Sequence, residues 1–221
     1  ITVVEPVIPA FFGVFVYVFC EARFTSILLL LMALVMCCHV LLEMYAKRKG
    51  RIYRMHPVWS GVLALSPVFC AGGINILSVL YSKQNSLLDY LNRLISSRLS
   101  LAKKGIELFG FSFWGTDIRM IGNGGTTARQ SQYFFLDSAY MQFSLQYGLV
   151  ILFLILMMMI LLCCRARAQK QWEFLWVLVF VAINGVIEAN IFQLIYCPFL
   201  LAFFAETGEK LKSRRKLNEK N

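Results

Sequence analysis

The sequence predicts an all-α integral membrane protein, a polytopic helical bundle of about six spans with one large extracytoplasmic loop. Its composition is the first reason, because 59% of the 221 residues are hydrophobic and only 15% are charged. In soluble domains, hydrophobic residues make up about 45–50% of the chain and charged residues about 25%. The second reason is that apolar stretches of about 20 residues recur, which is the length of a spanning helix. The third is that basic clusters flank these stretches. A soluble domain, a disordered chain and a fibrous protein are thereby excluded.

Residues 1–81 are expected to form three N-terminal spans. The apolar stretches cover about residues 7–20, 26–45 and 58–81. Pro6 suits the start of the first helix better than its middle. The second stretch is the longest uninterrupted apolar run of the three, so it is the clearest candidate span.

Residues 139–206 are expected to form three more spans. The first of them covers about residues 139–164. The apolar stretch 172–204 is too long for one helix across a hydrocarbon core of about 30 Å. Polar residues near Glu188 interrupt it, so we interpret it as a hairpin of two short helices.

Basic clusters set the predicted orientation, because cytoplasmic loops carry an excess of Lys and Arg. These clusters lie near residues 47–54, 165–170 and 210–220, the last within a basic cytoplasmic tail, 207–221. Six spans place all three on the cytoplasmic side and residues 82–138 outside. The formal net charge of +10 is therefore interpreted as topology and contact with membrane lipid headgroups. We expect no nucleic-acid partner.

The seven Cys lie in or beside apolar stretches, form no C-x-x-C pair and have no His at zinc-ligand spacing. We interpret them as small packing residues and predict no metal site and no cofactor. His39 falls inside an expected span and His56 on the cytoplasmic side, so neither is expected to act in the outer loop.

The outer loop, residues 82–138, carries seven basic and four acidic side chains. It is either an ordinary polar loop or a basic surface that holds an anionic headgroup or diphosphate, for which the Arg fork is suited. Apolar residues at helical spacing predict an amphipathic helix over 87–99, lying on the membrane or packed against the spans.

Two further segments of the loop have more than one interpretation. The aromatic stretch 108–115 suits core packing, an interfacial loop or a platform for a sugar. Asp137 or Ser138 can cap the apolar helix that follows, or Asp137 acts as a general base at the outer surface.

Together these residues resemble the bacterial O-antigen/capsular polysaccharide polymerase family. The likeness is carried by residues 91–102, 109–115, 133–140, 146–149 and 187–201, and it is strongest to exopolysaccharide polymerases of Gram-positive bacteria. The family has more spans before its loop, so we expect this chain to be an N-terminally incomplete member.

The resemblance implies a multi-pass enzyme of the bacterial cytoplasmic membrane. Such glycosyltransferases join oligosaccharide repeat units carried on a polyprenyl diphosphate at the outer face of that membrane. The implied partners are polyprenyl-diphosphate-linked oligosaccharides, membrane lipids and other capsule-assembly membrane proteins.

The resemblance also implies roles for single residues. Arg98 matches the loop arginine expected to bind the diphosphate, and Arg93 and Arg119 are further candidates for that role. Asp137 stands where the wider superfamily often has a His, and it would accept the proton of the acceptor hydroxyl. Tyr140 lies one turn further on and is expected to line the same pocket.

Two other functions stay open at this point. A ligase of the same superfamily would transfer the finished glycan to a different acceptor with the same loop chemistry. A transporter or flippase of lipid-linked oligosaccharide would show inverted repeats and broken spans. The polar residues concentrate in one loop, which favours the enzyme.

Overall fold

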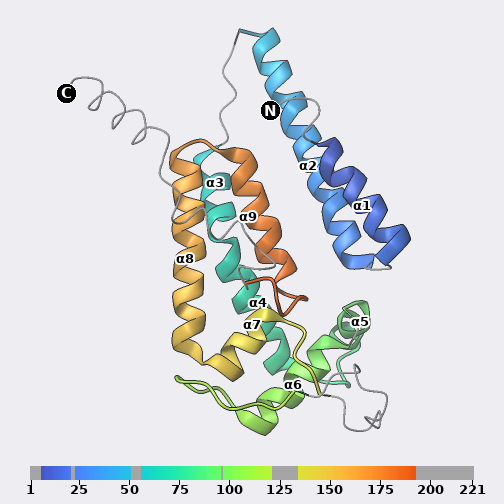
Figure 1. Cartoon of the computed structure of the whole chain (residues 1–221), viewed down its shortest axis with the longest axis vertical. Helices are drawn as coiled ribbons and strands as arrows, with labels where there is room; N and C mark the ends of the chain where they lie inside the picture. The colour runs from blue at the N-terminus through green and yellow to red at the C-terminus, as the bar shows by residue number, and fades with distance from the viewer. Residues whose placement is uncertain (1–5, 21–22, 51–55, 96, 121–133, 193–221) are drawn as a thin grey trace, which may run out of the picture.

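The computed structural model describes residues 6–20, 23–50, 56–95, 97–120 and 134–192. Within these ranges the chain is helical and has no β-strand (Figure 1). Predictions that concern the last part of the apolar stretch 172–204, the basic tail 207–221 and the middle of the outer loop fall outside the described residues.

The first two helices, α1 (Val7–Cys20) and α2 (Arg23–Arg48), form a hairpin. Gly13 allows the two helices to approach closely, since a Cβ there would lie 3.0 Å from the Cγ of Leu30. The Ser26 hydroxyl donates a hydrogen bond of 2.6 Å to the Gly13 carbonyl. Most side chains on the far side of the hairpin are large, apolar and exposed, as expected for helices that face lipid.

The third apolar stretch is two helices instead of one. Helices α3 (Pro57–Ala64) and α4 (Ser66–Leu80) meet at Leu65 with a bend of 51°. Pro67 explains the break, because a proline has no N–H to donate to the carbonyl four residues earlier and its ring crowds that turn.

The fourth stretch, expected as one helix over 139–164, is also broken. It begins with the short α7 (Ala139–Gln142) and a π-helical turn, η2 (Phe143–Tyr147). The main helix, α8 (Leu149–Ala168), starts only after Gly148, whose φ of 94° ends the preceding turn. A π-helical turn widens the helix locally and often marks a bend.

A tight turn then leads into α9 (Trp172–Asn184), which ends well before the apolar stretch does. The chain turns over residues 185–192, near the reversal expected at Glu188. Residues 193–206, the expected returning helix, lie outside the described ranges.

The described residues contain two helices that are long and apolar enough to cross a membrane, α2 and α8. The bent pair α3–α4 makes a third if it is one span, while α1 and α9 are shorter apolar helices. The structure therefore supports a membrane protein with two to three candidate spans, and the total of six stays a prediction.

The structure has two distinct ends. The last turns of α2 and α8, which carry Lys47, Arg48, Arg165 and Arg167, lie at one end, and α5 (Ser86–Leu94) and α6 (Arg98–Phe109) lie at the other (Figure 1). Basic residues at one end and the polar loop at the other agree with the predicted orientation. Which end faces the cytoplasm stays a prediction.

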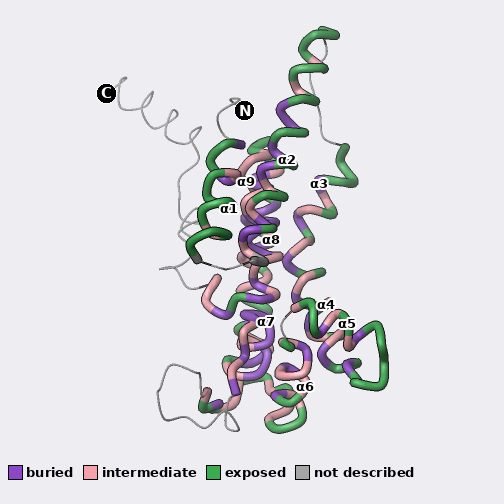
Figure 2. The backbone as a smooth tube through the Cα atoms, turned by 90° about the vertical axis from the view of Figure 1, so that its right-hand side faces the viewer, coloured by how far each residue is buried: buried purple, intermediate pink, exposed green. Residues whose placement is uncertain are grey.

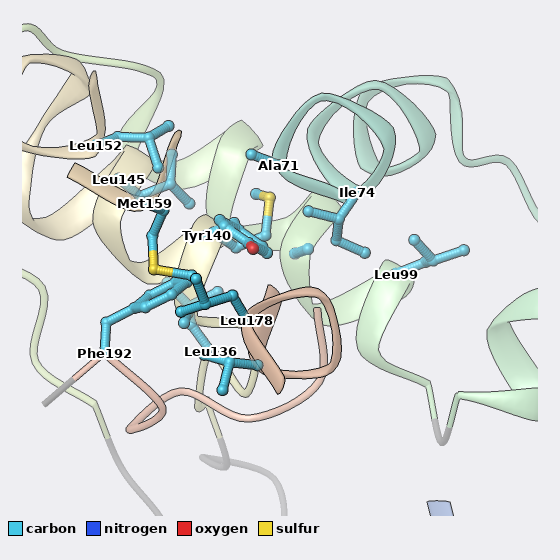
Figure 3. Close-up of a cluster of buried hydrophobic side chains, with 14 of the residues drawn as sticks. Ala71, Ile74, Leu99, Leu136, Tyr140, Leu145, Leu152, Met159, Leu178 and Phe192 are labelled. Atoms are coloured by element: carbon cyan, nitrogen blue, oxygen red, sulfur yellow. The ribbon is translucent and has the colours of Figure 1, made fainter. Parts of the chain in front are cut away.

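A buried core joins α4, α6, α7, α8 and α9. Buried residues are the purple segments of the tube in Figure 2. Tyr140 lies at its centre, among Ile74, Leu145, Met159 and Leu178 (Figure 3). This core holds α6 and the start of α7 together at the loop end of the molecule.

Candidate functional site

Arg98 and Asp137, 39 positions apart in the sequence, meet at the loop end of the molecule. The Nε of Arg98 lies 3.5 Å from an Oδ of Asp137, and the two side chains are 24% and 27% exposed. This Nε is buried and makes no aligned hydrogen bond. The pair is therefore half-buried and accessible to a ligand, while the contact between the two groups is loose.

The corner between α5 and α6 positions Arg98. The sequence predicts one amphipathic helix over 87–99, but the helix ends at Leu94 and restarts at Arg98. Ser97 takes a left-handed conformation with φ 64°, which redirects the chain between the two helices. Arg98 is consequently the first residue of α6 and not a residue on the face of a longer helix.

Asn92 holds this corner in place, and it is a residue that the sequence analysis did not single out. Its side chain is buried, accepts a hydrogen bond of 3.0 Å from the Ser100 backbone and donates one of 3.1 Å to the Tyr81 hydroxyl. It thus connects α5 to the first turn of α6 and to the end of α4. The only signal in the sequence is a polar residue among apolar ones, and that pattern does not reveal its partners.

Asp137 lies beside the end of α9, because the two residues that follow it are hydrogen-bonded to the backbone there. The backbone N–H of Ala139 donates a 3.0 Å hydrogen bond to the Gly185 carbonyl, and the Ser138 hydroxyl donates one of 3.3 Å to the same oxygen. Ser138, not Asp137, occupies the N-cap position of α7, and its side chain makes no capping bond. The carboxylate of Asp137 is therefore directed to Arg98 instead of to the helix.

The surroundings of Asp137 raise its pKa. Burial is the largest cause, and the negative charge of Glu188 adds to it, whereas the Arg98 guanidinium lowers the pKa. Glu188 is exposed and lies in the turn after α9, which the sequence analysis treated only as a chain reversal. A carboxylate with a raised pKa is a stronger base than an ordinary aspartate.

Helix lengths place this site deeper in the bundle than the first residue of α8. Helices α8 and α9 are joined by a tight turn and contain 20 and 13 residues. At 1.5 Å per residue, α9 ends about 10 Å short of the level of Gly148. Gly185, and with it the start of α7, therefore lies within the length spanned by α8 and not at the level of its first residue.

The other two arginines predicted to bind the diphosphate lie elsewhere. Arg93 is 71% exposed on α5 and pairs with Asp89 one turn away, at 3.2 Å. Arg119 is exposed in the segment that follows α6. The structure thus selects Arg98 as the arginine that it brings to Asp137, and the diphosphate role of the other two stays a prediction.

Tyr140 has a different environment from the one that the sequence suggested. Its side chain is fully buried, and its hydroxyl donates a 2.9 Å hydrogen bond to the Ala182 carbonyl in α9. The Phe192 ring packs on it with 5.3 Å between ring centroids (Figure 3). Tyr140 therefore connects α7 to α9, and its buried side chain does not line a pocket among the described residues.

No group of three or more metal-ligating side chains occurs among the described residues. His39 is buried within α2, next to Glu43, far along the chain from the outer loop. His56 stands at the start of α3, where its Nδ1 accepts a 3.4 Å hydrogen bond from the Val58 backbone. His39 thus lies in a candidate span, as expected, and the side of the membrane on which His56 lies stays a prediction.

Comparisons with known proteins do not identify the chain: no family model, no curated protein and no solved structure matches it.

Proposed function

We propose that the protein polymerises polyprenyl-diphosphate-linked oligosaccharide repeat units into capsular or exopolysaccharide at the outer face of the bacterial cytoplasmic membrane. The observation that carries the proposal is the contact between Arg98 and Asp137. A guanidinium suited to a diphosphate and a carboxylate with a raised pKa meet at the loop end of the bundle. In the proposed orientation this end faces the outer leaflet, whose headgroup layer is where a lipid-linked substrate presents its diphosphate.

The proposed step is a glycosyl transfer. The bond between the anomeric carbon of the growing chain and its diphosphate oxygen breaks, and that carbon forms a bond to a hydroxyl oxygen of the next repeat unit. Asp137 takes the hydroxyl proton, while Arg98 balances the charge that develops on the departing polyprenyl diphosphate. The atoms balance without a metal ion or a nucleotide sugar. A ligase would differ only in the acceptor, so the product identifies which reaction occurs.

The test compares polymer length on gels from cells whose only copy of the enzyme is a variant, at equal protein level. Arg98→Ala and Asp137→Asn should abolish long polymer, and Arg98→Lys should restore it only partly, because lysine lacks the fork. Lys104→Ala is the matched control, since it removes an exposed cation of α6 that has no proposed role in the site. Long polymer from either Arg98→Ala or Asp137→Asn would refute the proposal.

One observation favours a transporter of the same lipid-linked sugars as a second candidate. The bend of 51° between α3 and α4, and the early end of α9, are broken spans of the kind found in transporters. Purified protein in vesicles with a fluorescent polyprenyl-diphosphate sugar would separate the two functions. A transporter moves the probe across the bilayer at unchanged glycan length, and a polymerase lengthens the glycan.

A further inference from the structure

The aromatic loop, residues 111–116, is fixed to the start of α8 by its own backbone. The N–H of Leu149 donates to the Ser112 carbonyl at 3.0 Å, and the N–H of Val150 donates to the Phe113 carbonyl at 3.3 Å. In the other direction, the N–H of Thr116 donates to the carbonyl of Leu145 at 3.1 Å. These bonds satisfy backbone groups that the first turn of α8 would otherwise leave open.

Two glycines make this contact possible. Gly115 and Gly148 have φ values of 88° and 94°, and each lies against the backbone of the opposite segment. A Cβ on Gly115 would overlap the Gln146 carbonyl oxygen, and one on Gly148 would overlap the Phe113 carbonyl oxygen. The aromatic loop is therefore held rigidly at one level of the molecule, although it carries no regular secondary structure.

The backbone of the aromatic loop is fixed, but its largest side chains are uncovered within the described part of the chain. Trp114 is 84% exposed and Phe113 is 70% exposed. The polar side-chain groups of the loop are the Ser112 hydroxyl, which accepts a hydrogen bond of 3.4 Å from the backbone N–H of Trp114, the Trp114 indole N–H and the Thr116 hydroxyl. The most exposed surface of the loop is thus mainly aromatic.

The position of the aromatic loop along α8 indicates what covers these rings. Helix α8 has 20 residues, which span about 30 Å and match the hydrocarbon core of a bilayer. Arg165 and Arg167 mark one end of that span, so the other interface lies at Gly148, against which Trp114 packs. Ile151, Phe153 and Leu154 continue the exposed apolar surface from the loop along α8.

We infer that the aromatic loop is a membrane-interface anchor, in which Trp114 and Phe113 insert between the lipid headgroups of the outer leaflet. Tryptophan suits this position because its large apolar ring and its N–H match the boundary between the acyl chains and the headgroups. The rigid attachment to Gly148 would fix the depth of α8 in the membrane. It would thereby fix the depth at which Arg98 and Asp137 lie, whatever reaction this pair supports.

Tryptophan fluorescence tests this inference directly. The chain has four Trp, so Trp59→Phe, Trp172→Phe and Trp176→Phe together leave Trp114 as the only emitter. The purified protein is placed in phosphatidylcholine vesicles that contain lipids brominated either near the headgroup or near the chain end. We expect strong quenching of Trp114 by the shallow bromines, weak quenching by the deep ones and weak quenching by aqueous iodide.

A matched control keeps Trp176 as the only emitter. This residue lies within α9 with a buried indole N–H, so the shallow bromines should quench it much less than they quench Trp114, and iodide should quench it weakly. If the triple variant does not fold, the difference between the wild type and Trp114→Phe gives the same signal. Strong iodide quenching without bromine quenching would show that the loop faces water. Protection from both quenchers would show that a protein surface covers it. Either result would overturn the inference.

Discussion

Opposing influences act on the carboxyl group of Asp137. Burial and the nearby charge of Glu188 favour its protonated form, and the Arg98 guanidinium favours its ionised form. The balance leaves the pKa of Asp137 raised, so the carboxylate binds a proton more strongly than that of an exposed aspartate. A general base in the proposed transfer needs this property.

This balance predicts a pH dependence. Polymerisation should fall at acid pH as Asp137 becomes protonated, at a higher pH than an ordinary aspartate would require. Glu188→Gln removes the negative charge that raises the pKa, so Asp137 should stay ionised to lower pH and the acid limb should move down. The rate of polymer formation in membranes, measured against pH, checks this. Glu107→Gln, which removes a carboxylate that pairs within α6, should leave the acid limb in place.

Tyr140 provides a second prediction at the scale of one residue. Tyr140→Phe removes one buried hydrogen bond to the Ala182 carbonyl and leaves the ring packing unchanged, so the free energy of unfolding should fall by about 1 kcal/mol. Thermal unfolding in detergent and polymer formation are measured on the same sample. A packing role predicts lower thermal stability with polymer retained. Loss of polymer at unchanged stability would instead favour the substrate-binding role that the sequence suggested.

At the scale of elements, the helices expected near the site are broken into shorter ones. Pro67 separates α3 from α4, Ser97 separates α5 from α6, and Gly148 separates η2 from α8. Breaks of this kind turn chain ends toward the loop end of the bundle. As a result, Arg98 stands at the start of a helix, and Asp137 stands just before one, where their side chains can meet.

Gly110, directly before the aromatic loop, and Gly115, within it, allow a matched comparison. Gly110 and Gly115 have φ values of 65° and 88°, so alanine is strained at both, by about 1–2 kcal/mol. A Cβ on Gly110 meets nothing within 4 Å, whereas one on Gly115 overlaps backbone. Gly115→Ala should therefore destabilise the protein by about 1–3 kcal/mol more than Gly110→Ala does. Equal unfolding temperatures for the two variants would contradict the described attachment to α8.

At the scale of the whole molecule, the distribution of charge and the lengths of the apolar helices define one axis. The basic last turns of α2 and α8 point to the same end of the molecule, where Arg167 of α8 donates a 3.2 Å hydrogen bond to the Pro57 carbonyl at the start of α3. The loop helices and the Arg98–Asp137 pair lie at the opposite end (Figure 1). The positive-inside rule assigns the basic end to the cytoplasm.

Labelling of single cysteines tests that assignment. In a background without the seven native Cys, Gln84→Cys lies between α4 and α5, and Gln169→Cys lies between α8 and α9; both positions are exposed. A membrane-impermeant maleimide added to intact cells should label the first variant and not the second. After the cells are broken open, both should react, which controls for accessibility. Labelling of Gln169→Cys alone in intact cells would invert the predicted orientation.

The sequence by itself determined the class of protein, because composition and the length of apolar stretches depend on the chain alone. A helical membrane protein and the helices near 7–20 and 26–45 follow from these quantities, and the returning helix expected after Glu188 stays a prediction. It also singled out Arg98 and Asp137, from a resemblance and from their place in the one long polar loop. The basic clusters, which also depend on the chain alone, gave the expected orientation in the membrane.

Only the tertiary structure decided which loop arginine meets Asp137, because that contact depends on where helices stop. Local hydrophobic periodicity continues through Ile95 and across Gly148, so it does not mark those breaks, whereas the left-handed backbone at Ser97 and the crowded contact of Gly115 with Gly148 arise from packing. The same packing buries Tyr140 against α9 and brings Asn92 to Ser100. Contacts between residues far apart in the chain have no periodic signal in the sequence, and these contacts built the site.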